Sequence, residues 1–500
     1  MYARRVFYSI DIIACRMSRE KEHRMERNWQ HSINGIIGKI ITIIQLGVSI
    51  WFIISLWTSG MVPMKFMMMI IVAALVMFLI TFGLQFVRSN GANLAGMILS
   101  VLFLAVFAFG TAAFLTANST LENVGGATYK TDNMLVVVRS DDPAETITDA
   151  KDYLFGRLTT VDQENTEKML NEIRENVGQE ISVLQYETIQ EEAQALLNGE
   201  IEAAVYNEAY AGVIEETIEG YSDQIKILHN YGIKTKIEVE ERSVEKPFNV
   251  YISGIDVSGP ITTSSRSDVN IIMTVNPETK KILLTTTPRD YYVEIPEVSG
   301  GQKDKLTHAG IYGVDRSMAT LENLYGIDVT YYARVNFTSL IKIVDALGGV
   351  DVNSEYAFKA GGYSFSKGMN HMDGKKALAF SRERHSFSDG DNQRGKNQEA
   401  VLSAIIQKAA SPAILTSANQ ILGNIGDSVE TNMTHDEMAQ LINMQLSEGG
   451  SWEVESQAAS GKGDNQSCFS SGSQQLYVMW PDEAVVGELS RKMKQVLGEN

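Results

Sequence analysis

Three apolar runs near the N-terminus constrain this chain more than any other feature of its sequence. They cover residues 40–57, 66–87 and 92–116, and none of them contains Asp, Glu, Lys or Arg. An α-helix rises about 1.5 Å per residue, so each run is about long enough to cross ~30 Å of hydrocarbon. A cleavable signal peptide would be a single, shorter run. We therefore expect three transmembrane helices within residues 40–118.

The basic residues around these runs predict the direction of crossing. They gather before the first run, whereas the 58–63 link has none: Arg4, Arg5, Arg16, Arg19, Lys21, Arg24, Arg27 and Lys39. Cytoplasmic flanks carry an excess of Lys and Arg. Residues 1–39 are therefore expected in the cytoplasm. Three crossings then leave the remainder of the chain on the extracellular side of a cell membrane.

Charge and cysteine usage exclude several classes of function. The formal net charge is -18 at pH 7, so the soluble part would repel a nucleic acid. Cys15 and Cys468 are the two cysteines, and they lie on opposite sides of the predicted membrane segment. A disulfide framework and cysteine-ligated metal sites are therefore excluded.

The stretch 121–240 has the pattern of a small α/β domain. Short apolar runs alternate with helical patterns along it. We expect strands at 134–139, 181–186 and 202–206, helices at 146–158, 165–177 and 189–197, and continued alternation at 213–221 and 225–228. Its acidic residues predict a solvated surface, and a cation or partner site is the alternative.

A charged stretch ending at Pro247 predicts a linker, and a larger region occupies residues 245–500. Strands are predicted at 248–252, 270–275 and 281–285, with a turn at Asn276-Pro277. Helices are predicted at 317–325, 338–347 and 393–409. Because strands and helices interleave, we expect an α/β fold, arranged as an α/β/α sandwich.

The first group of chemically interesting residues lies in and after a loop rich in Gly, Pro and Ser. It contains Asp256, Arg266 and Asp268. Loops at strand ends bind ligands in α/β sheets. The two carboxylates suit a divalent ion that keeps positions for phosphate oxygens, and the guanidinium suits a phosphate. The alternative is that these residues cap the loop and form surface ion pairs.

Two further groups add guanidinium side chains. Arg289 directly follows the strand at 281–285. Arg382 and Arg384 are two residues apart, so in extended backbone they would share a face. The following helix would carry three polar residues on one face, namely Asp391, Arg394 and Gln398. Arginines beside a helix N-terminus suit a pyrophosphate, and a solvated charge run is the alternative.

Other catalytic patterns are absent from the sequence. We find no phosphate-binding P-loop, no Gly-x-Ser-x-Gly elbow, no Cys/His nucleophile pair and no zinc-type spacing. His308 and His385 are interpreted as structural histidines.

The order of these motifs resembles that of the LytR-CpsA-Psr family. The resemblance is strong over residues 247–411 and weaker beyond. It rests on Asp256, Arg266-Ser-Asp268, Pro288-Arg289-Asp290, Lys305-Leu-Thr-His-Ala309, Asn336-Phe337, Asp345-Ala-Leu-Gly-Gly-Val350, Arg382-x-Arg384 and Asp391-x-x-Arg394-x-x-x-Gln398. The three spans and the additional domain before the catalytic one are similar to the capsule branch of that family.

The resemblance implies a transferase. Such an enzyme moves a glycopolymer, here capsular polysaccharide, from a polyprenyl-pyrophosphate carrier onto peptidoglycan, with magnesium, and releases polyprenyl phosphate. It implies that Asp256 and Asp268 bind Mg²⁺. It also implies that Arg266, Arg289, Arg382 and Arg384 hold the pyrophosphate, supported by Asp391, Arg394 and Gln398.

Several points stay open at this stage. Either Asp268 or Asp391 is the base for the attacking sugar hydroxyl. The lipid would need an apolar cavity, for which Val269, Ile271, Met273 and the helix at 338–347 are the candidates. The alternative activities are hydrolysis of the same lipid pyrophosphate and a membrane-bound regulator that attenuates transcription.

Overall fold

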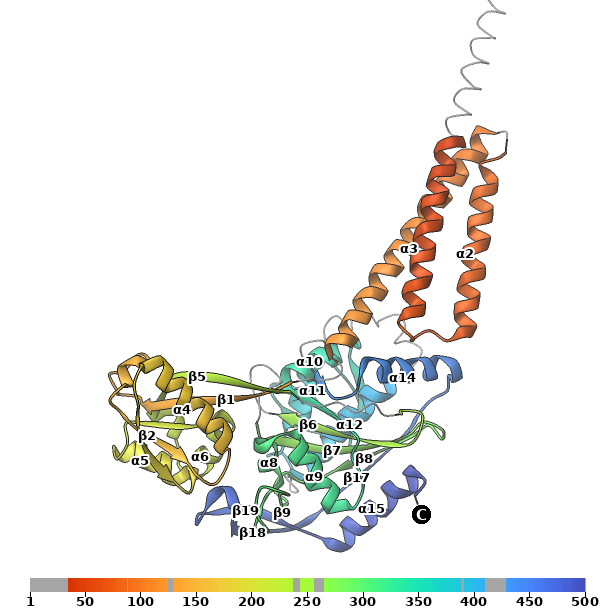
Figure 1. Cartoon of the computed structure of the whole chain (residues 1–500). Coiled ribbons are helices and arrows are strands. Elements are labelled where there is room, and N and C mark those ends of the chain that lie inside the picture. The colour runs from red at the N-terminus through yellow and green to blue at the C-terminus, as the bar shows by residue number, and fades with distance from the viewer. Residues whose placement is uncertain are drawn as a thin grey trace, which may run out of the picture. The chain divides into compact units, whose positions relative to one another are not determined.

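The computed structural model describes residues 35–87, 89–124, 129–236, 243–255, 265–387, 391–409 and 429–499. The chain divides into two compact units. One comprises Met1–Asn118 with Ile442–Gly449, and the other comprises Ser119–Leu441 with Gly450–Asn500. Figure 1 labels the elements of both units.

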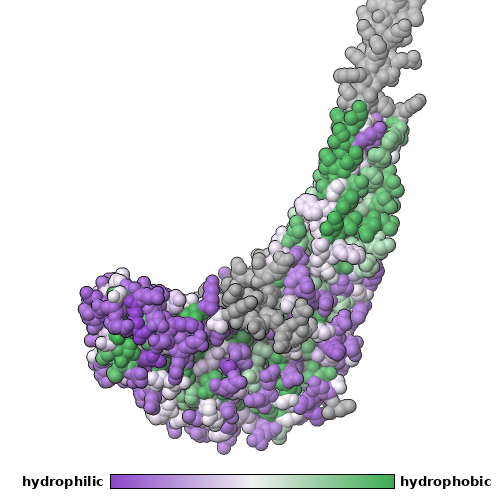
Figure 2. Space-filling view, viewed as in Figure 1, coloured by the Kyte–Doolittle hydropathy of each residue, from purple (hydrophilic) through white to green (hydrophobic). Residues whose placement is uncertain are grey.

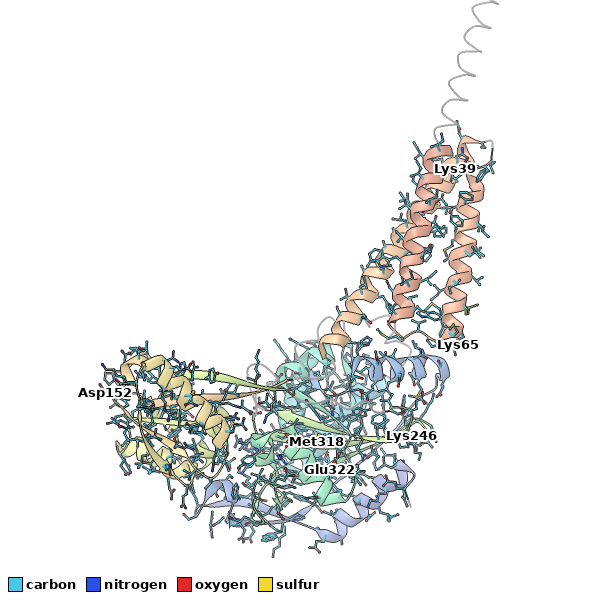
Figure 3. All side chains as sticks on the ribbon, viewed as in Figure 1. Lys39, Lys65, Asp152, Lys246, Met318 and Glu322 are labelled. Atoms are coloured by element: carbon cyan, nitrogen blue, oxygen red, sulfur yellow. The ribbon has the colours of Figure 1, made fainter. Side chains whose placement is uncertain are left out.

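The first unit contains three long apolar helices. They span Gly35–Thr58, α2 (Met64–Leu84) and α3 (Asn90–Val124). All three are long and apolar enough to cross a membrane, which confirms the three predicted spans. Their outward surface is apolar: Figure 2 shows it in green, and the Phe109 side chain is 76% exposed. Lys39 and Lys65 mark opposite ends of the helices in Figure 3.

Several polar side chains lie inside this helical unit. The Thr81 hydroxyl donates to Oε1 of Gln45 at 3.0 Å, and the hydroxyls of Thr42 and Ser100 lie 3.2 Å apart. All four residues are buried. Lipid offers no hydrogen-bond partner, so transmembrane helices turn such groups toward one another. This inside-out polarity supports the membrane interpretation.

Residues 129–236 of the second unit, here called the N-terminal sheet region, form a five-stranded sheet in the order β3-β2-β4-β1-β5. Parallel pairs join β2 to β3 and β4, and antiparallel pairs join β1 to β4 and β5. The strands are β1 (Tyr129–Arg139), β2 (Leu154–Leu158), β3 (Ser182–Tyr186), β4 (Ala203–Asn207) and β5 (Ile225–Lys236). The helices are α4 (Gln163–Val177), α5 (Ile189–Asn198), α6 (Ala211–Thr217) and α7 (Tyr221–Gln224).

One predicted helix in this region is wrong. Residues 146–158 form a 3-10 turn, Ile147–Ala150, followed by strand β2. The strand lies between β3 and β4. A Cβ at Gly156 would lie only 2.6 Å from the Ile201 side chain, so the strand depends on close contacts with distant residues. A local helical pattern does not contain that information.

Residues 248–497, here called the C-terminal sheet region, are built on a six-stranded sheet in the order β16-β11-β6-β7-β8-β17. The strands are β6 (Phe248–Ile255), β7 (Ser267–Asn276), β8 (Lys281–Thr286), β11 (Tyr331–Asn336), β16 (Val429–Thr431) and β17 (Glu453–Ala458). The helices are α8 (Leu306–Ala309), α9 (Val314–Tyr325), α10 (Phe337–Ala346), α11 (Gly374–Arg382), α12 (Asp391–Ala409), α14 (His435–Glu448) and α15 (Glu483–Leu497). Two-stranded pairs complete the region: β9 (Tyr292–Glu294) with β10 (Lys303–Lys305), β12 (Val350–Ser354) with β15 (Gly368–Met372), β13 (Phe358–Ala360) with β14 (Tyr363–Phe365), and β18 (Gly461–Ser467) with β19 (Gln475–Pro481).

Alternating residues of the six-stranded sheet face different helices. Tyr251, Ile272 and Leu283 belong to one core with residues of α9 and α15. The neighbouring positions Ile252 and Ile271 belong to a second core with residues of α12. Side chains of a strand alternate between its faces, so helices cover both sides of this sheet. The predicted α/β/α arrangement is confirmed.

Candidate active site

A cavity of about 420 Å³ lies between the six-stranded sheet and helices α10 and α12. Its apolar lining comes from strand residues on one face and from helix residues opposite: Ile252, Ile255, Val269, Ile271, Val335, Leu340, Val401, Leu402 and Ile405. Three expectations for an apolar cavity hold, since Val269, Ile271 and Leu340 of α10 all line it. Met273 does not; it packs in the core beside it.

Four arginines line the same cavity, and they come from separate loops and helix ends: Arg289, Arg382, Arg384 and Arg394. Arg289 follows β8. Arg382 ends α11, Arg384 lies two residues later, and Arg394 is in the first turn of α12 with Gln398 one turn beyond. Among the described lining residues, Asp268 provides the one carboxylate. The cavity wall is therefore strongly cationic.

Arg382 and Arg384 reach the cavity differently from the sequence prediction. Extended backbone was expected for both, but α11 continues to Arg382. Its N-terminus is capped by the Asp373 side chain, which accepts from the backbone N–H of Lys376 at 2.8 Å. Both arginines still line the cavity because the chain leaves the helix beside it. The backbone between them thus differs from the prediction, and the phosphate-binding role of both side chains stays a prediction.

Asp268 lies at the start of β7, where the pairing with β6 shifts by one residue between Gly254 and Ile255. Such a bulge re-aims side chains at a strand end. The Asp268 carboxylate accepts from the Arg289 guanidinium at 2.8 Å and from the Thr307 hydroxyl at 3.4 Å. This ion pair fixes both groups at the cavity wall.

The donor set is compatible with Mg²⁺ only if a ligand contributes oxygens. No cluster of three or more His, Cys, Asp or Glu side chains suited to a metal occurs in the described ranges. Mg²⁺ usually binds one or two carboxylates together with substrate phosphates and water. Asp268 lines the cavity and fits that mode. Asp256 lies outside the described residues.

The structure does not place two other predicted site residues, Arg266 and Asp391, at the cavity wall. Arg266 does not line the cavity; its guanidinium is hydrogen-bonded to the Glu216 carboxylate of α6. Asp391 begins α12, but its side chain lies outside the described part of the structure. The roles predicted for Arg266 and Asp391 remain predictions.

His308 is a structural histidine, as its sequence context suggested. Its Nδ1 lies 2.7 Å from Asp304 and 2.8 Å from the Ser470 hydroxyl, and all three residues are buried. A Ser-His-Asp triad uses opposite ring nitrogens for the acid and the serine, and its serine must meet substrate. One nitrogen faces both partners here, so this cluster is not a nucleophilic site.

His385, in contrast, lines the cavity and is exposed. Sequence reasoning interpreted it as structural. Its position directly after Arg384 was the signal that would have placed it at the site. Asn336 and Ser381 line the cavity as well. Asn336 caps α10, with its side chain accepting from the backbone N–H of Ser339 at 2.9 Å.

The arrangement suits an amphiphile with an anionic head. Apolar side chains form one part of the lining and guanidinium groups form another. Guanidinium groups bind phosphate oxygens with paired N–H donors, and desolvation strengthens such contacts. An apolar chain would gain about 25 cal/mol for each Å² removed from water. A phosphorylated lipid combines both properties.

Comparisons with known proteins agree with this chemistry. Residues 214–494 match the model of the LytR_cpsA_psr family. A protein of Bacillus mycoides named polyisoprenyl-teichoic acid–peptidoglycan teichoic acid transferase TagU is 39% identical over 203 residues, covering 40% of this chain and 66% of that protein. The protein of the same name from Bacillus cereus is 37% identical over 232 residues, covering 46% of this chain and 75% of its own.

The solved structure of B. subtilis TagV is 25% identical and covers 51% of this chain and 99% of its own, with a TM-score of 0.44. A second family model, DNA polymerase processivity factor, matches residues 91–206. That stretch begins inside the apolar helix α3 and stops before β5, so it follows no structural boundary of this chain.

Proposed function

Because the chain belongs to the LytR_cpsA_psr family, we propose that it transfers a glycopolymer from a polyprenyl diphosphate carrier to peptidoglycan. The observation that carries this proposal is the cavity, whose apolar lining and four arginines suit the two ends of such a carrier. Three membrane helices would keep the enzyme beside its lipid substrate. We place the two sheet regions on the extracellular side, where peptidoglycan lies.

The proposed reaction is a phosphoryl transfer. A sugar hydroxyl of peptidoglycan attacks the phosphorus that carries the polymer, a new P–O bond forms, and the diphosphate P–O bond breaks. Polyprenyl phosphate leaves, and the hydroxyl proton goes to a carboxylate, either Asp268 or Asp391. Arg289, Arg382 and Arg384 would stabilise the negative charge of the phosphates in a partly dry site.

The metal belongs to this proposal. Asp268 and Asp256 would hold a magnesium ion beside the diphosphate oxygens, where the ion would neutralise charge as the bond breaks. The Asp268 carboxylate at the cavity wall supports this assignment. Capsular polysaccharide is our proposal for the polymer, since the three spans and the additional sheet region resemble the capsule branch of the family.

The test separates transfer from hydrolysis. Full-length protein in detergent is mixed with a synthetic lipid-diphosphate oligosaccharide and Mg²⁺, with and without peptidoglycan, and polyprenyl phosphate is measured. Transfer predicts release that depends on peptidoglycan and covalent labelling of the peptidoglycan. Equal release without peptidoglycan would instead make the chain a hydrolase, and no release in either condition would leave a regulatory role.

A further inference from the structure

Among the contacts between the N-terminal and C-terminal sheet regions, those of one acidic side chain, Glu216, lead toward the cavity carboxylate Asp268. Glu216, on α6, accepts a hydrogen bond from the Arg266 guanidinium, which also donates to the backbone carbonyl of Gly212 at 3.4 Å. Arg266 lies two residues before Asp268, at the start of β7. Helix α6 therefore holds the chain by Arg266, two residues before Asp268, whose carboxylate lines the cavity.

The same glutamate begins a chain of alternating charges. Its Oε2 lies 3.3 Å from Nζ of Lys305, whose other carboxylate partner is Asp290 at 2.8 Å. Asp290 lies 3.8 Å from Nε of Arg289, and Arg289 in turn pairs with Asp268 at 2.8 Å. Each side chain in the series is at least three-quarters buried. Two routes thus lead from Glu216 to the Asp268–Arg289 pair.

The lowered pKa of Glu216 shows that its neighbours favour the ionised carboxylate. Burial alone would raise its pKa, but His308, with Nε2 at 3.8 Å, and the charges of Lys305 and Arg266 lower the pKa to about 2. Lys305 is almost fully buried, with 6% of its side chain exposed. Removing one partner of a buried ion pair leaves the other charge uncompensated. Without Glu216, the Lys305 charge would be balanced among the described residues by Asp290 alone, at 2.8 Å, so Asp290 would be shared less with Arg289.

We propose that Glu216 is a positioning residue for the cavity, so that the N-terminal sheet region holds Arg289 and Asp268 in place for the lipid diphosphate. The region is then a structural part of the active site. This inference rests on the proposed function, because it assigns the diphosphate to the cavity. It adds a residue from outside the six-stranded sheet to the machinery that recognises it.

Binding of geranylgeranyl diphosphate to the full-length protein in detergent tests the idea. Glu216→Gln keeps the size of the side chain and removes its charge, and we expect affinity to fall about tenfold, as for other residues that orient a ligand-binding group. Glu215→Gln is the matched control. Among the described residues, the Glu215 carboxylate accepts hydrogen bonds from Gly220 and Ser222 of its own region, so affinity should stay within about twofold.

Two more variants keep the test independent of folding. Glu216→Asp restores the charge and should recover part of the affinity, whereas a packing role predicts no recovery because Asp fills less space. Gly212→Ala places a methyl group 2.6–2.8 Å from the Arg266 guanidinium, so it displaces Arg266 while Glu216 keeps its charge. We expect this variant to weaken binding about threefold, since the displaced group acts only through the strand.

The outcomes separate the two proposals. Wild-type protein that fails to bind the diphosphate would overturn the proposed function. Wild-type binding with unchanged affinity in Glu216→Gln and Gly212→Ala would overturn the positioning role alone. Equal losses in Glu216→Asp and Glu216→Gln would also overturn it, because the carboxylate would then contribute nothing beyond packing.

Discussion

Both faces of the six-stranded sheet present apolar side chains, but one face forms a closed core and the other lines a cavity. On one face, Ile272 and Leu283 pack against Leu321 of α9 and Met493 of α15 in a closed core. On the other, Ile271 and its neighbours face α10 and α12 across a cavity of about 420 Å³. Protein interiors are normally close-packed, so a space of this size gives up many contacts. The face with the cavity therefore contributes less packing energy than the closed face.

The charged residues near the two faces differ in the same way. Arg316 of α9, on the packed side, pairs with Glu297 and with Asp315 at the surface. On the cavity side, arginines from separate segments converge on one space beside a single described carboxylate. Paired surface charges contribute little to stability, whereas guanidinium groups held around one partly buried space suit a bound anion. Substitutions on the two sides should therefore have opposite consequences for stability and function.

The largest effect is expected at the cavity arginines. Arg384→Ala removes a contact to a desolvated phosphate, so the activation or binding free energy should worsen by about 2–5 kcal/mol while the fold survives. Arg316→Ala is the matched variant and should cost about 1 kcal/mol or less in stability, with no loss of activity. Lipid-diphosphate binding and thermal unfolding of both variants make the check. Similar activity in the Arg384→Ala and Arg316→Ala variants would mean that Arg384 is a solvated surface charge with no role in binding.

A buried carboxyl group behind the cavity gives the second effect. Burial raises the pKa of Glu399 to about 7, and its carboxyl accepts from the backbone N–H of Thr286 at 3.1 Å. The folded state thus keeps a proton that the unfolded state has lost. The stability from this proton is fully present below pH 4.5, the usual pKa, and is lost as pH rises through about 7.

The variant Glu399→Gln cannot ionise, so its unfolding free energy should not show this loss. Between pH 4.5 and 7 the unfolding free energy of the variant, relative to that of the wild type, should rise by about 1.4 kcal/mol per pH unit at most. Urea unfolding in detergent at several pH values measures the difference. Parallel curves for the two proteins would mean that Glu399 is ionised inside the fold.

The third effect concerns the metal. Asp268→Asn keeps the size of the side chain but removes a charge, so the Mg²⁺ concentration needed for half-maximal turnover should rise about tenfold, equivalent to ~1.4 kcal/mol. Asp315→Asn on the packed side should leave the requirement unchanged. Turnover in EDTA that equals turnover in Mg²⁺ would remove the metal from the mechanism.

Local patterns carried much of the fold and of the site. The apolar runs at 270–275 and 281–285, joined by a turn, predicted the hairpin of β7 and β8, because both strands are bounded by nearby residues. The helix at 165–177 was equally clear. Arg382 and Arg384, which line the cavity, were predicted to bind an anion because two guanidinium groups beside a helix start suit one; that role stays a prediction.

What the sequence could not predict depends on contacts between distant residues. Strand β2 was read as helix because its identity depends on pairing with β3 and β4. Glu216 looked like one acid among many, since Arg266 and Lys305 lie 50 and 89 residues further along the chain. Glu216 bridges Arg266 and Lys305 only once the folded chain brings α6 beside them.

The smallest effect is expected from substituting two adjacent isoleucines that lie on opposite faces of the six-stranded sheet. Ile272 is fully buried in the packed core, so Ile272→Val should lower the unfolding free energy by about 0.5–1.5 kcal/mol. Ile271→Val should cost less, because part of that side chain faces the cavity and has fewer atoms to lose contact with. Its effect should appear in ligand binding, as a weaker preference for long prenyl chains. Urea unfolding and binding of prenyl diphosphates of increasing length measure the two quantities. Equal stability losses with unchanged binding would mean that the cavity face is an ordinary core. The two residues are adjacent and chemically identical, so only lipid binding at the cavity face would make their variants differ.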